Sequence, residues 1–187
     1  MNYPGTNPIK TKNLELRRFE YEDALELYSN YGSDDRVNRY INFNMCTTLE
    51  KAEEFIDYHL IKYQSDPGFF GWAVTLDGKV IGSAALFNFD NVNDSIEVGY
   101  SIGSRWWNRG YMTEVLAALI SYAFENVGAN RVFGIYHIDN AASGRVMHKN
   151  SMKKEGVFRK GQKNHDGTYS DAVICSILRE EYYGNIS

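Results

Sequence analysis

Residues 95–114 read SIEVGYSIGSRWWNRGYMTE and predict a strand, a short loop and a helix in succession. Every second position of the first part is apolar, as in a strand: Ile96, Val98, Tyr100 and Ile102. The helix begins at or just after Gly110, and the first N–H groups of a helix are free to bind an anion. The junction therefore predicts a diphosphate cradle flanked by Arg105 and Arg109. A plain loop with two solvated arginines is the alternative.

The flanking sequence predicts a sheet covered by helices. We expect further strands at residues 14–18, 70–76, 79–88, 131–138, 156–160 and 171–178, and helices at 21–31, 111–126 and 142–149. Another helix opens with a Thr47–Glu50 capping box and runs to the Pro67–Gly68 stop. Residues 131–138 are apolar enough to predict a continuously buried strand. Hairpin signals at Asp77-Gly78 and Asp166-Gly167 favour an antiparallel meander. We therefore expect an α+β fold, α/β in some schemes, with a mixed but mostly antiparallel sheet flanked by about four helices.

Composition bounds the function. The 187 residues are 43% hydrophobic with a net charge of −4, which is typical of a folded domain without the positive field that nucleic acid binding needs. No linker divides the chain, so residues 1–187 form one expected domain. The sequence shows neither a signal peptide nor a stretch of ~20 apolar residues, which predicts a cytoplasmic protein away from membranes. Cys46 and Cys175 are expected to be reduced and buried.

Three motifs resemble those of the GNAT N-acetyltransferases, specifically the RimJ/RimL-like branch that acetylates protein N-termini. Residues 107–114 (WNRGYMTE) align with the W-x-[KR]-G-Y-x-T-E loop, although Met112 replaces a small residue. Residues 140–152 resemble N-x-x-S-x-x-V-M-x-K-x-G-[FM], with Ser151 in place of the glycine. Residues 166–171 and 176–180 resemble D-G-x-x-x-D and S-[IL]-L-R-E. The resemblance covers almost the whole chain.

The resemblance implies a GNAT fold and direct acetyl transfer from acetyl-CoA to a primary amine. It implies that backbone groups of Tyr100 and Ile102 pair with pantetheine, and that Asn140 and Ser143 lie by the cofactor's amide and sulfur. The diphosphate would lie on the loop and the helix start, at Trp107, Asn108, Arg109, Gly110, Tyr111, Met112 and Thr113. The acceptor would be an amine, chiefly a protein N-terminus, and the enzyme a monomer or homodimer.

Two side chains are candidates for catalysis. Glu97 alternates away from its apolar neighbours and could act as a base through water, or it could form an ion pair with an arginine on a neighbouring strand. Many GNAT enzymes use a helix tyrosine as the general acid, but Met147 stands at that position. Ser143 is the nearest substitute, and its alternative role is a helix N-cap.

The histidines lack the spacing of a metal site, so no metal is expected. His137, beside Asp139, is expected to be hydrogen-bonded locally. Four aromatic residues in loops could wall a substrate cleft: Tyr40, Phe43, Trp106 and Trp107.

Two other functions remain open at the sequence level. A small-amine acetyltransferase acting on a polyamine, an aminoglycoside or an amino acid would need converging carboxylates, for which Asp34, Asp35, Glu53 and Glu54 are candidates. A non-catalytic acyl-CoA sensor is favoured only by Ser151 and by the missing tyrosine.

Overall fold

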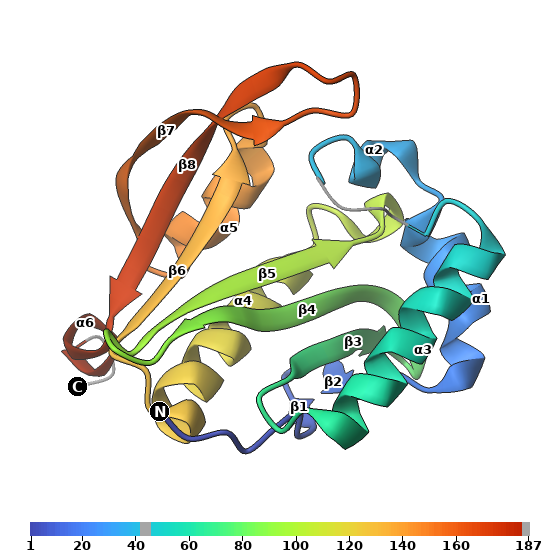
Figure 1. Ribbon diagram of the computed structural model, residues 1–187, viewed down its shortest axis with the longest axis horizontal. Coiled ribbons are helices and arrows are strands. Elements are labelled where there is room, and N and C mark those ends of the chain that lie inside the picture. Colours follow the sequence, from blue (N-terminus) through green and yellow to red (C-terminus); the bar gives the residue numbers. More distant parts are fainter. Residues whose placement is uncertain (42–45, 185–187) are drawn as a thin grey trace.

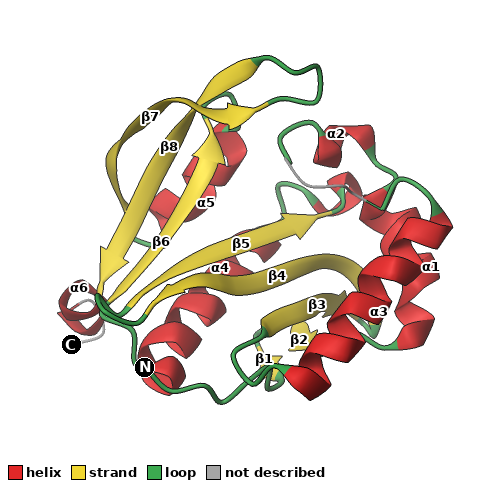
Figure 2. Ribbon diagram, viewed as in Figure 1, coloured by secondary structure: helices red, strands yellow, loops and turns green. Residues whose placement is uncertain are grey.

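The computed structural model describes residues 1–41 and 46–184, and its centre is one sheet of eight strands (Figures 1 and 2). The strands are β1 (Ile9–Lys10), β2 (Glu15–Arg17), β3 (Phe70–Leu76), β4 (Lys79–Asp90), β5 (Ser95–Ile102), β6 (Arg131–His137), β7 (Lys153–Lys163) and β8 (Tyr169–Leu178). Their order is β1-β2-β3-β4-β5-β6-β8-β7. Within this sheet β5 and β6 are parallel, and every other neighbouring pair is antiparallel.

The helices connect and cover the strands. They are α1 (Ala24–Leu27), α2 (Asp35–Asn38), α3 (Leu49–Ser65), α4 (Tyr111–Tyr122), α5 (Ala141–Lys149) and α6 (Arg179–Gly184). A 3₁₀ turn at Tyr21–Asp23 and a π-helical turn at Tyr28–Gly32 extend α1 at its two ends. Another π-helical turn, Ala123–Val127, continues α4, and Gly128 ends it with a left-handed φ of 83°.

Neighbouring strand residues divide between two hydrophobic clusters, one on each face of the sheet. In β4, Val80 belongs to the cluster under α1 and α3, whereas Ile81 belongs to the larger cluster under α4. In β3, Ala73 and Val74 divide in the same way. Because successive strand side chains point to opposite faces, α1 and α3 cover one face and α4 the other. Figure 1 shows α4 and α5 behind the sheet and α1 and α3 in front of it.

The structure confirms the α+β class and the β3–β4–β5 meander. The Thr47–Glu50 capping box is wrong, because Thr48 is the N-cap of α3 and its hydroxyl accepts from the N–H of Lys51. The continuously buried strand is also wrong: β6 alternates, and Ile135 is 37% exposed. The reason is that β6 has helical cover on one face, from α4 and α5, and none from α1 or α3 on the other. The sequence reading missed three short elements, β1, α2 and α6.

Cys46 and Cys175 are free and buried, as expected. Within residues 1–41 and 46–184, no helix combines the length and the apolar character needed to cross a bilayer.

Ser151, which stands at the glycine position of the family motif, has a structural role at the end of α5. Its φ is 61°, in the left-handed region that favours glycine. Its N–H donates to the carbonyl of His148 at 3.0 Å, and that of Met152 donates to the carbonyl of Met147 at 3.1 Å. Such bonds are characteristic of a left-handed helix C-cap. The glycine of the family motif therefore stands at the position that ends α5, and Ser151 fills that structural position here.

Replacing Ser151 by Gly should raise the free energy of unfolding by about 0.5–1 kcal/mol, because glycine adopts left-handed φ without a Cβ clash. Urea denaturation measures the difference. Ser151→Ala is the matched control, since it removes the hydroxyl but keeps the Cβ, and it should give no gain. Equal stabilities of the Gly and Ala variants would show that the backbone is not strained there.

Candidate functional site

The strands β5 and β6 pair over a short stretch and then separate. Their parallel register joins Ser95, Ile96 and Glu97 to Arg131, Val132 and Phe133. Beyond these pairs β5 continues to Ile102 beside β4, while β6 continues to His137 beside β8. We call the diverging parts, residues 98–102 and 134–137, the β5–β6 splay; Figure 1 shows the two strands pointing apart.

One edge of β5 faces this splay. The N–H of Gly103 donates to the carbonyl of Ile81 in β4 at 2.9 Å. A Cβ added at Gly82 would lie 2.2 Å from the carbonyl oxygen of Ser101, so this carbonyl also points toward β4. Because polar backbone groups of successive antiparallel residues point to alternate sides, those of Tyr100 and Ile102 point away from β4, into the splay.

The loop after β5 turns the chain into α4 with two left-handed residues. Asn108 has a φ of 61° and Gly110, the N-cap of α4, a φ of 85°. The N-cap has no side chain, and the first helical turn closes with the N–H of Glu114 bonded to the carbonyl of Gly110. The N–H groups of Tyr111, Met112 and Thr113 precede that bond and have no acceptor within the helix. These are the N–H groups that the sequence analysis assigns to an anion cradle, and that role stays a prediction.

The loop side chains mainly fix the backbone. The indole N–H of Trp107 donates to the carbonyl of Ile102 at 3.0 Å and ties the loop to the end of β5. Met112 is buried in the core under α4. Asn108 and Arg109 are exposed. A cofactor on this loop would therefore meet mainly backbone groups, with Arg109 as an exposed charge beside them.

Helix α5 begins beside the splay. Asn140 is its N-cap, and its Oδ1 accepts from the N–H of Ser143 at 3.2 Å. The N-cap alternative for Ser143 is therefore wrong. Instead, the Ser143 hydroxyl lies 3.0 Å from the phenol oxygen of Tyr100. The sequence reading missed this contact, because the alternation of β5 predicted only that Tyr100 is an apolar strand position.

Met147, at the position of the expected tyrosine, is 2% exposed and fills the apex of the splay. A Cβ added at Gly134 of β6 would lie 2.6 Å from the Met147 methyl carbon and 3.3 Å from a methyl group of Val98. The glycine thus makes room for the methionine, whose role is packing.

Glu97 lies where β5 and β6 are still paired, opposite Phe133. Its Oε2 accepts from the side-chain amide of Asn88 at 2.7 Å. Among the ion pairs of the described residues none includes Glu97, and Arg131 pairs with Glu155 at 2.5 Å. The ion-pair alternative therefore fails. Burial raises the pKa of Glu97, and the Asn88 hydrogen bond only partly opposes this shift.

Glu114, in the first turn of α4, points away from the cradle. It accepts from the Thr11 hydroxyl and from the backbone and side-chain N–H groups of Asn13 at 2.7 and 2.8 Å. Burial opposes ionisation, but these donors outweigh it and lower the pKa of Glu114.

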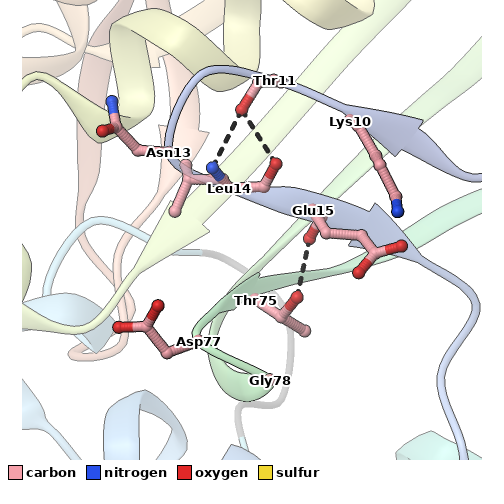
Figure 3. A pocket seen from close by; sticks show the side chains of 8 residues that line it. All are labelled: Lys10, Thr11, Asn13, Leu14, Glu15, Thr75, Asp77 and Gly78. Carbon is pink, nitrogen blue, oxygen red and sulfur yellow. Dashed lines mark hydrogen bonds between the residues drawn. The ribbon is translucent and has the colours of Figure 1, made fainter.

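Thr11 and Asn13 also line a pocket between the β1–β2 turn and the β3–β4 hairpin (Figure 3). None of the predicted site residues lines that pocket, so we assign it no part in the site.

The remaining predicted residues lie around the end of the splay. Ring centroids of Tyr40 and His137 are 5.0 Å apart, and Trp106 packs on the core. Phe43 lies outside the described residues. His137 is hydrogen-bonded locally, as expected, to the N–H of Asp139 and to Asn164. Across residues 1–41 and 46–184, no three His, Cys, Asp or Glu side chains come together as a metal site would require.

Comparison with known proteins gives a family for this arrangement. The model of the acetyltransferase (GNAT) domain matches residues 13–153. The uncharacterized N-acetyltransferase p20 of Bacillus licheniformis is 30% identical over 177 residues, which cover 94% of this chain and 98% of that protein. The [ribosomal protein uS5]-alanine N-acetyltransferase of Escherichia coli is 29% identical over 123 residues, 64% of this chain and 61% of that protein. A GNAT-family acetyltransferase from Bacillus anthracis has a similar structure, with a TM-score of 0.81 and 26% identity over 94% of this chain and 100% of that one.

Replacing Gly110 by Val should weaken acetyl-CoA binding about tenfold or more, because a β-branched residue resists a φ of 85° and displaces the amides of the cradle. The space around Gly110 is open, so a valine side chain there would clash with no other residue. The expected loss of affinity therefore comes from the backbone conformation. Gly78→Val is the matched control: its φ is 81°, its surroundings are equally open, and it lies in the β3–β4 hairpin. Calorimetry should show reduced affinity only for the Gly110 variant. Equal affinities for both variants would contradict the placement.

Replacing Arg109 by Ala should weaken acetyl-CoA binding by at most about fivefold, because an exposed charge is screened by solvent and salt. The same titration, repeated at high salt, measures this loss. A loss larger than that of Gly110→Val, persisting at high salt, would show that the side chain and not the backbone holds the diphosphate.

Proposed function

This chain belongs to the GNAT acetyltransferase family and is an acetyltransferase, and we propose that it transfers the acetyl group of acetyl-CoA directly to the N-terminal α-amine of a protein, as RimJ/RimL-like enzymes do. One observation carries the cofactor part of the proposal. The edge of β5 that faces the splay and the first amides of α4 lie at the two ends of one loop, and on that edge the Ile102 carbonyl already accepts from the Trp107 indole. Pantetheine would pair with Tyr100 and Ile102, and the diphosphate would lie on the amides of residues 109–113.

Glu97 would act as a base through water. At pH 7.4, removing a proton costs ~0.5 kcal/mol for an N-terminal amine with a pKa of ~7.8, but ~4 kcal/mol for a lysine near ~10.4. A carboxylate without a cationic partner and with a raised pKa accepts a proton more readily than an ordinary one. An N-terminal amine needs no stronger base.

The acceptor part rests on a relative and on charge. The relative from Escherichia coli bears the name of an alanine N-acetyltransferase of ribosomal protein uS5. The carboxylates that would favour a cationic small molecule are engaged or turned outward. Asp34 caps α2 and accepts from Arg36 and Ser104, and Asp35 and Glu54 are exposed. Glu53 on α3 is half-buried, and this single carboxylate would not be enough to hold a polyamine.

The sensor alternative loses one of its two supports, because the position of Ser151 serves to end α5, and a departure from glycine there is no sign of lost transfer chemistry. Its other support is the missing tyrosine, and Ser143 supplies a hydroxyl beside the splay.

The test is release of free CoA thiol in the presence of acetyl-CoA and one of three acceptors. These are a peptide with a free N-terminus, the same peptide blocked at its N-terminus but carrying a lysine, and a polyamine. Turnover with the first should exceed that with the others. Preference for the polyamine or the lysine would overturn the acceptor, and acetyl-CoA binding without any turnover would identify a sensor.

Replacing Glu97 by Gln should lower kcat by about 10²–10⁴-fold, with a smaller loss at high pH, where the amine deprotonates unaided. Stability should not fall at neutral pH. The raised pKa of Glu97 means that ionisation costs the folded state stability above the carboxyl's ordinary range, and Gln removes that cost. Initial rates and thermal melts across pH 5–9 measure both effects.

Glu155→Gln is the control with the opposite signature. Glu155 accepts from Arg131 and from the Ser176 hydroxyl, both at 2.5 Å, and these hydrogen bonds lower its pKa. Its variant should lose stability and keep kcat. A destabilised but fully active Glu97→Gln enzyme would refute the role of Glu97.

A further inference from the structure

Tyr100 has a side-chain contact that its expected role on the strand does not use. Its phenol oxygen lies 3.0 Å from Ser143 Oγ and 3.3 Å from the Ser143 carbonyl oxygen. Both contacts cross from β5 to α5, where β5 no longer pairs with β6. The hydroxyl pair therefore spans the splay on the face that α4 and α5 cover.

The backbone of Ser143 is fixed independently of Tyr100. Asn140 accepts its N–H, and the end of α5 is attached to α4, because the amide of Asn150 donates to the carbonyl of Thr113 at 3.1 Å. What remains free at Ser143 is the rotation of its hydroxyl. A hydroxyl has one proton and two lone pairs, so its neighbours decide where the proton points.

Tyr100 can supply that direction. Burial raises the pKa of Tyr100, which keeps the phenol protonated and able to donate. When the phenol donates to Ser143 Oγ, the shorter of its two contacts, the Ser143 proton is free for a third partner. Hydrogen bonds linked in this way strengthen one another.

We propose that Tyr100 is a positioning residue, whose phenol donates to Ser143 Oγ and so directs the Ser143 proton toward the sulfur of acetyl-CoA. This inference rests on the proposed function. As the amine nitrogen bonds to the acetyl carbon, the carbon–sulfur bond breaks and its electron pair goes to sulfur. The Ser143 hydroxyl donates a hydrogen bond to the thiolate that forms. The proton lost by the amine passes through water to Glu97 and then to solvent, and the released thiolate takes one from solvent.

This assignment also accounts for Met147. The helix position from which a tyrosine would act holds a buried methionine packed on Gly134. A phenol reaches the site from β5 instead, and it acts through the serine.

Tyr100→Phe tests the proposal, because it keeps the buried ring and removes the hydroxyl. With the acceptor that gives the highest turnover, kcat should fall about tenfold, while the acetyl-CoA dissociation constant should change less than about twofold. Ser143→Ala should lower kcat by about 10²-fold, as expected for the loss of a donor to a developing anion. In the Ser143→Ala background, adding Tyr100→Phe should lower kcat by less than about a further twofold, because the phenol acts only through the serine.

Tyr58→Phe is the control. It removes one phenol oxygen, as Tyr100→Phe does, but from an exposed ring on α3 outside the splay. We expect it to leave kcat unchanged. Melting temperatures and circular dichroism confirm that each variant is folded before rates are compared per folded molecule.

Three results would overturn the inference. The first is an unchanged kcat for Tyr100→Phe. The second is that Tyr100→Phe lowers kcat equally in the parent enzyme and in the Ser143→Ala variant. The third is that Tyr100→Phe lowers only the affinity for acetyl-CoA. Turnover with lysine or a polyamine would refute the proposed acceptor but leave this test valid, since it concerns the leaving group. Absence of turnover with every acceptor would overturn the proposed function and this inference together.

Discussion

The short parallel pairing of β5 with β6 is the constraint on which the site depends. Parallel strands require a crossover, and α4 supplies it. After three residue pairs each strand follows its own antiparallel neighbour, β4 or β8, and sheet twist carries the two directions apart. The edge of β5 that faces the splay and the amides at the start of α4 that no helical carbonyl accepts are thus two results of one topology. The loop of residues 103–110 joins them at the end of the sheet where the strands have separated.

Side-chain contacts fix the elements around the splay. Where β5 and β6 begin to separate, the side chains of Val98 and Met147 pack over Gly134. Further along, Trp107 ties the loop to Ile102, and Glu114 ties the first turn of α4 to Thr11 and Asn13. A negative charge at a helix N-terminus would compete with a bound diphosphate, but the donors on the β1–β2 turn hold this one away from the cradle.

The sequence predicted the elements with strong periodicity and the positions where glycine conformations are needed. Strands β3 and β5 begin and end at the expected residues, and α4 begins directly after Gly110, as the sequence indicated. It could not predict short elements such as β1 or α2, because two or four residues carry no periodic signal. It also could not decide between an ion pair and a lone carboxylate at Glu97. That choice depends on Arg131 binding Glu155, a contact between strands that no local pattern encodes.

Binding and chemistry in this site depend on different parts of the chain. The expected cofactor contacts are backbone groups, so Met112 can depart from the family pattern while its side chain packs in the core, and the Trp107 side chain serves to tie the loop to β5. The expected chemistry depends on side chains, each of which is held by one neighbour: Glu97 by Asn88, and Ser143 by Tyr100. A substitution in the loop therefore acts through backbone conformation. A substitution at the paired side chains acts through a single hydrogen bond, and its effect falls on the rate of the reaction.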